Sequence, residues 1–302
     1  MMVARRPAMN LVERLVAVAV VGCVLGGCTV APPTAPGDTS MDGADLTGAS
    51  FTMPKAIIDY ENQMGWGTHH LRWHTERQWN LLGPSDRAWA QKQGWSAATI
   101  QEGRAGNGLE FLAMHRVMIG LLVKQYPQYK SLFTGWTVIP TTPNDPTAPK
   151  TTETFSPDML KAIDKLENHL GDFATDDDFG LYLETELRPT ASNPDARSSD
   201  TSTGIHNYIH NRFMDSSSPI DLGDPSKNLG NKVFWRLHGW IDARWTAFRA
   251  TKGLTNLDPA YLAALAKANS EMMKDMPKDG VPLGQDNTPP ESLTKFFEEE
   301  GL

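Results

Sequence analysis

Apolar residues recur every three to four positions in six stretches of this chain, which is the spacing that places them on one face of an α-helix. Regular alternation of apolar and polar residues, the pattern of a half-buried strand, is scarce. The third stretch also begins with Ser156-Pro157-Asp158, where a capping side chain precedes a proline that suits the first helical position. We therefore expect helices over residues 68–82, 108–124, 156–170, 204–213, 231–250 and 258–276.

Long segments rich in proline, threonine, asparagine and serine separate these helices, at residues 136–155, 187–204 and 214–230. Loops of this length within a compact domain are often functional. The pattern predicts an all-α helix bundle with long connecting loops, in which the segments 136–155 and 214–230 control access to any site in the core.

The first 28 residues read as a targeting segment. Arginines at 5, 6 and 14 precede an apolar run over 15–27 that is too short to span a bilayer. The run ends in Leu25-Gly26-Gly27-Cys28, which resembles a bacterial lipobox. We expect residues 1–27 to be a lipoprotein signal peptide and Cys28 to carry lipid, with a plain secretory signal or a short uncleaved anchor as alternatives.

Residues 28–50 are rich in proline, threonine, glycine, serine and aspartate, as in a flexible tether. Residues 51–302 then form one domain that ends in a helical tail. A lipid on Cys28 would place this domain in the cell envelope, outside the cytoplasm. The formal net charge of −8 and the lack of a basic stripe argue against nucleic acid as a partner. Contact with the membrane is therefore expected through the lipid anchor only.

Cysteine usage restricts the chemistry. The chain has two cysteines, Cys23 in the expected signal peptide and Cys28 at the lipidation site. Neither would be available for a disulfide or as a thiolate ligand in the mature domain. Any metal site must therefore use histidines and carboxylates.

Histidines form two similar groups. His70 and His74 stand four residues apart, as do His206 and His210 in HNYIH, so each pair shares one helix face. Each pair is followed by another histidine on the next apolar helix. The first group is thus completed by His115 and the second by His238.

Two such groups from four helices suit a dinuclear metal centre in the core of a bundle. Neutral imidazole is a good ligand for copper, iron and zinc. A carboxylate-bridged iron centre would also need a Glu-x-x-His motif, which the chain lacks. Copper is therefore favoured over iron, and zinc remains possible. His69 points about 100 degrees away from His70 around the helix and is a weaker candidate ligand. His169 belongs to neither group and is expected to be a surface or structural residue.

Three runs resemble the tyrosinase, catechol oxidase and hemocyanin family of type 3 dicopper proteins. KVFWRLHGWIDARW (232–245) is similar to the second-copper signature of that family, HNYIH (206–210) to its paired ligands, and FLAMHR (111–116) to its last first-copper ligand. The resemblance spans about residues 60–250. It implies two copper ions as cofactors and the oxidation of a small phenolic substrate, a monophenol or an o-diphenol, with dioxygen. The implied ligands are His70, His74 and His115 for one copper, and His206, His210 and His238 for the other.

The chain departs from the family pattern at three places. Gly106 stands where tyrosinases place a first-copper histidine, Asn231-Lys232 replaces an aspartate-proline pair, and Leu237 replaces the first of two adjacent histidines. The gap at Gly106 has two resolutions. Either His70 and His74 both bind the first copper, as an HxxxH pair does in arthropod hemocyanins, or the first site is degraded and holds one copper or none.

Further residues are implied as helpers. In tyrosinases an asparagine at the place of Asn207, together with an upstream glutamate, holds a water that deprotonates the phenol, and Glu184 and Glu186 are the upstream candidates here. Asp242, one helical turn after His238, either orients an imidazole or pairs with a nearby arginine. Met114 and Met118 beside His115 are expected to pack in the core.

Two other functions compete with the oxidase. One is a non-catalytic copper- or oxygen-binding lipoprotein with a degraded or shielded first site. The other is a mononuclear copper or zinc enzyme that uses only His206, His210 and His238.

Overall fold

Helices make up nearly all of the regular structure in the part of the chain that the structure describes. The computed structural model describes residues 51–141, 155, 157–185, 204–213, 220–275, 290–293 and 295. These residues belong to one unit, Asp42–Leu302. Within them, extended backbone pairs only at a single antiparallel bridge between Thr52 and Asn231. The prediction of an all-α fold is confirmed.

All six predicted helices are present; five have ends within two residues of those expected, whereas α2 ends at Arg77, five residues before the predicted end. Three helices without a prediction, α1, α3 and α6, join them. The elements in chain order are α1 (Lys55–Gln63), α2 (Trp66–Arg77), α3 (Pro84–Lys92), α4 (Asn107–Gln125), the 3-10 helix η2 (Pro127–Phe133), α5 (Pro157–Asn168), η3 (Leu170–Asp172), α6 (Asp176–Thr185), α7 (Ile205–Phe213), η5 (Asn228–Gly230), α8 (Lys232–Thr251) and α9 (Pro259–Asp275).

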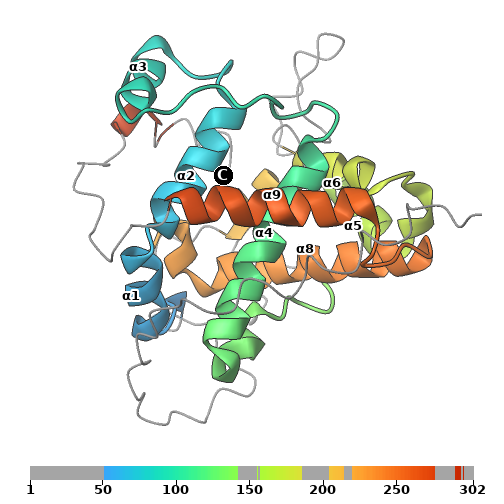
Figure 1. Cartoon of the computed structure of the whole chain (residues 1–302). Coiled ribbons are helices and arrows are strands. Elements are labelled where there is room, and N and C mark those ends of the chain that lie inside the picture. Colours follow the sequence, from blue (N-terminus) through green and yellow to red (C-terminus); the bar gives the residue numbers. More distant parts are fainter. Residues whose placement is uncertain are drawn as a thin grey trace, which may run out of the picture. The chain divides into compact units, whose positions relative to one another are not determined.

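Helix α4 is the centre of the packing and contacts α6, α8 and α9 (Figure 1). Its first turn lies against α6 with almost no space between the two backbones. A Cβ atom on Gly108 would lie 2.3 Å from the Asp177 carbonyl oxygen, so only glycine permits this crossing. Further along, Phe111, Met118 and Leu122 are fully buried in the core. The helix that carries His115 is therefore held on several sides.

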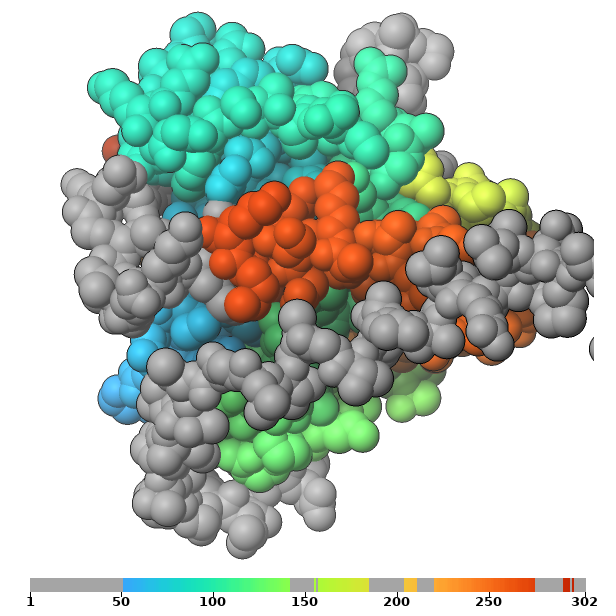
Figure 2. Space-filling model, in the orientation of Figure 1, coloured from blue at the N-terminus to red at the C-terminus, as the bar shows by residue number. Residues whose placement is uncertain are grey.

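Helix α9 lies across α2 and α4 on the face shown in Figure 2. A network of charged side chains fastens it there. The buried Arg77 on α2 is 2.6 Å from Glu110 on α4 and 3.7 Å from Glu271 on α9, and Lys267 on α9 also pairs with Glu110. Because Glu110 accepts from both cations, α9 is tied to the two helices that carry His70, His74 and His115.

Several sequence predictions fall on residues outside the described part of the chain. These are the expected signal peptide 1–27, Cys28, the tether 28–50, Glu186 and much of the three long loops. In the part that is described, no helix has both the length and the apolar character needed to cross a membrane.

Candidate metal centre

Six histidines from four helices meet in the core. His70 and His74 come from α2, His115 from α4, His206 and His210 from α7, and His238 from α8. None of their side chains is more than 3% exposed. Two sets of three have their ligand nitrogens within 4.8 Å of one another, and either set could hold a metal ion; they are His70, His74 and His115, and His115, His206 and His238.

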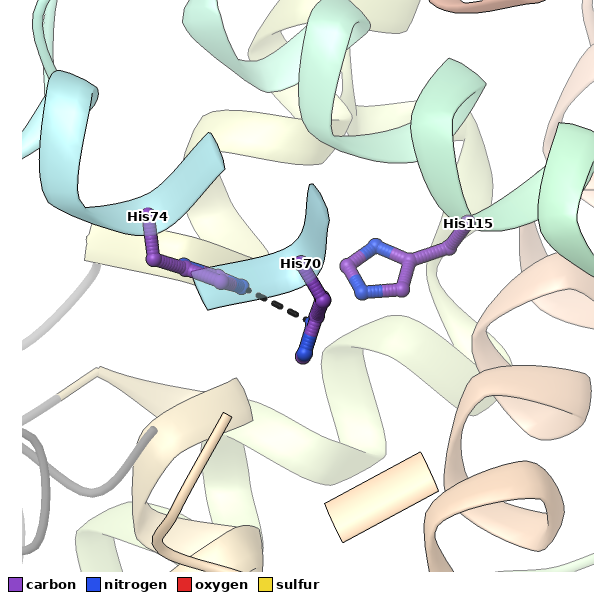
Figure 3. Close-up of side chains that lie close together, drawn as sticks. All are labelled: His70, His74 and His115. Atoms are coloured by element: carbon purple, nitrogen blue, oxygen red, sulfur yellow. Dashed lines mark hydrogen bonds between the residues drawn. The ribbon is translucent and has the colours of Figure 1, made fainter. Parts of the chain in front are cut away.

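The first set matches the sequence prediction (Figure 3). His70 and His74 project from the same side of α2 toward His115 on α4, and the Nε2 atoms of His70 and His74 lie 3.2 Å apart. The HxxxH spacing is the cause, because residues four apart stand one above the other on a helix. The ring centroids of the pair are accordingly 4.7 Å apart.

The second set differs from its prediction in one member. It contains His115, which also belongs to the first set, where His210 was expected; the ring of His115 stacks on that of His238 with centroids 4.0 Å apart. His210 is nevertheless adjacent, with its ring centroid 4.5 Å from that of His206 and 5.3 Å from that of His238. The six imidazoles therefore form one continuous cluster in which His115 joins the two groups.

Backbone carbonyls of the segment before α8 anchor one histidine from each HxxxH pair. His70 Nδ1 donates to the Pro225 carbonyl at 2.9 Å, and His210 Nδ1 donates to the Leu222 carbonyl at 3.1 Å. A carbonyl oxygen can only accept, so Nδ1 must carry the proton and Nε2 must present its lone pair. The loop thus sets the ring orientation on both sides of the cluster.

The two histidines on α4 and α8 are anchored by their own helices. His115 Nδ1 donates to the Phe111 carbonyl at 3.0 Å, and His238 Nδ1 donates to the Phe234 carbonyl at 2.8 Å. His206 Nδ1 instead donates to the side-chain oxygen of Asn207 at 2.9 Å. With these, five of the six imidazoles direct an unprotonated Nε2 into the cluster.

The Nε2 atoms fit a cation. Those of His206 and His238 face each other at 3.1 Å, although both rings already carry their proton on Nδ1. Two lone pairs at this distance repel each other, whereas a metal ion between them would attract both. The Nε2 atoms of His115 and His210 are also buried and make no hydrogen bond with the described residues. Donor set and tautomers thus match what metal coordination requires.

Burial keeps these imidazoles neutral. Desolvation lowers the pKa of His70 to about 3 and that of His210 to about 4. It also lowers the pKa of His74, His115, His206 and His238 well below the usual value, and the neighbouring histidines add to the effect. A neutral imidazole is the form that binds metal, so the cluster is ready to bind without losing protons at neutral pH.

Gly106 has a structural role that a histidine could not fill. Its φ is +96°, a left-handed conformation just before α4, and its amide donates to the Asp177 carboxylate at 2.7 Å. A Cβ atom there would approach Ile100 Cδ1 to 3.0 Å. The structure instead brings two histidines from α2 to His115, which is the arrangement expected if the first group is intact.

The two remaining histidines lie elsewhere. His69 lines a separate cavity of about 120 Å³ with Arg72 and Glu271, on the side of α2 that faces α9. His169 is on the surface, 3.3 Å from Asp164, as expected. Met114 and Met118 are buried in the hydrophobic core, also as expected.

The expected helper residues have varied positions. Asn207 is fully buried and contacts the cluster through His206. Glu184 is buried on α6, and Asn107 donates a hydrogen bond to its carboxylate. Asp242 pairs with Arg116 on α4, with Nε and Oδ1 2.5 Å apart, so of its two expected roles the structure favours the ion pair.

An aromatic shell, which the sequence analysis did not predict, surrounds the imidazoles. Phe234 stacks on His238 with centroids 3.9 Å apart, Phe111 lies 4.7 Å from His115, and Trp73 lies 4.9 Å from His74. A signal for two of these residues exists in the sequence. Phe-x-x-x-His occurs at 111–115 and again at 234–238, and in both the carbonyl of the phenylalanine accepts the histidine Nδ1 proton.

Comparisons of this chain with protein-family models, with curated proteins and with solved structures found no match.

Proposed function

We propose that this chain is a copper-dependent oxidoreductase that oxidises phenols or catechols with dioxygen, as tyrosinases and catechol oxidases do. The observation that carries the proposal is the cluster of six buried imidazoles, five of which have Nδ1 bound to an oxygen acceptor and Nε2 directed inward. Anchoring of this kind is typical of metal ligands. The resemblance of the runs around His115, His206 and His238 to type 3 dicopper proteins selects copper among the metals that imidazole binds.

In this proposal, His70, His74 and His115 hold one copper ion, and His206, His210 and His238 hold the other. Bound copper would supply the redox chemistry, one electron from each ion, that the reaction of dioxygen requires. The part of the protein is to fix the rings through the Pro225 and Leu222 carbonyls, and to exclude bulk water by burial. Phe111 and Phe234 supply the apolar wall around the centre.

Asn207 is the proposed helper closest to the centre. Its side-chain oxygen accepts the Nδ1 proton of His206, which fixes the orientation of that ring. Its Nδ2 atom is buried and makes no hydrogen bond with the described residues, so it is available to hold a water or a substrate hydroxyl. Glu184 and Glu186 are the proposed proton acceptors from a phenol, and in Glu184 the carboxylate is bound by Asn107.

One observation favours a second candidate, a non-catalytic copper-binding protein. No histidine of the cluster is more than 3% exposed. A phenol ring could reach the centre only if the covering residues moved, whereas dioxygen is small enough to enter with less movement. In either role we propose that a lipid on Cys28 anchors the protein to a membrane outside the cytoplasm.

Copper content and catechol turnover test the proposal together. The chain is loaded with copper, freed of excess metal and analysed for copper per chain, then assayed with a simple catechol under air. We expect two copper ions and oxidation of the catechol. His74→Ala should lose one ion and the activity, and the matched control His169→Ala, at an exposed histidine, should keep both. Two ions without turnover would favour the binding protein, and one ion would favour a mononuclear site.

A further inference from the structure

A second cavity, outside the histidine cluster, has a buried carboxyl in its wall. It has a volume of about 230 Å³ and lies between α1, α2 and the segment that precedes α8. Its apolar lining comes from Ile58, Ile220 and Leu229. Glu61, on α1, is the acidic residue in the wall.

The walls of this cavity are held firmly together. Met53, just before α1, donates its amide to the Gly230 carbonyl at 2.8 Å, next to the bridge between Thr52 and Asn231. Helix α2 also packs closely against the segment that precedes α8, since a Cβ atom on Gly67 would lie 2.3 Å from the Ser226 carbonyl oxygen. Small-molecule sites are commonly formed before the ligand binds, and these contacts fit a site of that kind.

Among the described residues, Glu61 has no partner of the kind that a buried carboxyl needs. Its side chain is only 4% exposed, and its Oε1 atom makes no hydrogen bond with the described residues. The cation in the same wall, Lys227, is already 2.7 Å from Asp224. Burial raises the pKa of Glu61 well above its usual value, because desolvation disfavours the charged carboxylate. Such a group is costly unless something donates to it.

We propose that this cavity binds a small primary amine in its protonated form, with the ammonium on the Glu61 carboxylate and the alkyl group against Ile58, Ile220 and Leu229. An ammonium brings three donors and the missing positive charge. A neutral alcohol of the same size brings one donor and no charge. A carboxylate would add a second negative charge next to Glu61.

The site is independent of the proposed oxidase function, although the two are neighbours along the chain. Ser226 lines the cavity, and the preceding residue, Pro225, accepts the Nδ1 proton of His70. Glu61 itself belongs to neither set of ligand histidines. Binding of an amine can therefore be measured whether or not the protein oxidises phenols.

Isothermal titration calorimetry with n-butylamine tests the proposal on the full chain, with 1-butanol and butyrate as probes of the same length. We expect the amine to bind with a stoichiometry of one at this site, and both other probes to bind more weakly. Glu61→Gln should weaken amine binding by about tenfold or more, as expected for loss of a charge-assisted hydrogen bond. Amine that binds at the histidine cluster would do so in the wild type and in Glu61→Gln alike. The difference in affinity between the two proteins therefore reports on the Glu61 site.

Two further variants make the test specific. Asp59→Asn removes an exposed acid on the same helix that pairs with Lys55, and should leave binding unchanged. Ile58→Phe keeps the carboxyl but fills the cavity, and should abolish binding. Thermal unfolding verifies that each variant is folded, and Glu61→Gln has nearly the shape of the wild type. Absent amine binding, equal binding of 1-butanol, or unchanged binding in Glu61→Gln or Ile58→Phe would each overturn the proposal.

Discussion

As the pH is lowered, the metal-free protein should unfold at a pH well above that at which carboxylates titrate. The six clustered imidazoles stay neutral in the folded state because burial lowers their pKa. In the unfolded chain each regains a pKa near 6.5 and takes up a proton below it. The unfolded state then binds more protons than the folded state, so the free energy of unfolding rises with pH. The stabilisation is complete above about pH 6.5 and is lost as the pH falls.

The size of the effect can be worked out for His70 and His210. His70 and His210, with pKa values of about 3 and 4, remain almost wholly neutral in the folded protein at pH 5. Protonation of each in the unfolded chain at that pH contributes about 2 kcal/mol, or about 4 kcal/mol for the pair. The other four histidines shift in the same direction and add to this loss. The contribution of His70 and His210 alone is a large part of the stability of a typical domain, about 5–15 kcal/mol.

Urea unfolding at pH 7.5, 6.5, 5.5 and 5.0, followed by tryptophan fluorescence after removal of metal with a chelator, measures this dependence. His210→Gln removes one titrating ring and should reduce the loss between pH 6.5 and 5.0 by about 2 kcal/mol. The control His169→Gln, at an exposed position, should leave the loss unchanged. A free energy of unfolding that is constant or greater at pH 5.0 would refute the reasoning, because it would mean that the folded cluster accepts protons.

Three substitutions probe the supports of the cluster. Asn207→Ala removes the acceptor for His206 Nδ1 and should weaken metal binding by about 10- to 100-fold. Asn207→Asp keeps an acceptor and should retain most of the metal affinity, and metal titration against a chelator distinguishes the two variants. Asp242→Asn breaks the ion pair with Arg116 and should lower the free energy of unfolding in urea by about 1–3 kcal/mol. The metal content should stay unchanged because His238 is anchored by its own helix, and a loss of metal would contradict this. Gly108→Ala places a methyl group against the backbone of α6 and should lower the free energy of unfolding by about 1–3 kcal/mol in the same assay. An unchanged urea midpoint would show that α4 and α6 can move apart without cost.

The helices that carry the cluster could be predicted because each has a wide apolar face. This holds for α2, α4 and α8, and the ends of α4 and α8 lie within one residue of the predicted ones. Helix α6 escaped prediction for a physical reason. It begins with three aspartates, and what holds it in place is its close contact with α4, where Gly180 meets Gly108. A contact between residues so far apart in the chain leaves no periodic signal in either segment.

The sequence also predicted which histidines would meet, because HxxxH spacing fixes each pair on one helix face. It could not identify the anchors of the rings. The acceptors for His70 and His210 are carbonyls of an irregular segment, at Pro225 and Leu222, and a backbone carbonyl is present at every residue. Nor could it pair Glu184 with Asn107, since that contact depends on the packing of α6 against α4.

The chemical character of the anchors bears on which metal the centre prefers. In the described part of the chain both ligand sets contain only histidines, and the anchored rings donate to neutral carbonyl or amide oxygens. A buried set of neutral ligands gives no compensation for the charge of a divalent ion, and uncompensated buried charge is costly. Such a set therefore favours a singly charged ion such as Cu⁺, or a pair of ions that share an anionic ligand from outside the protein. For the copper centre that we propose, this environment favours Cu⁺, a state that has no counterpart for zinc, which is restricted to the divalent state.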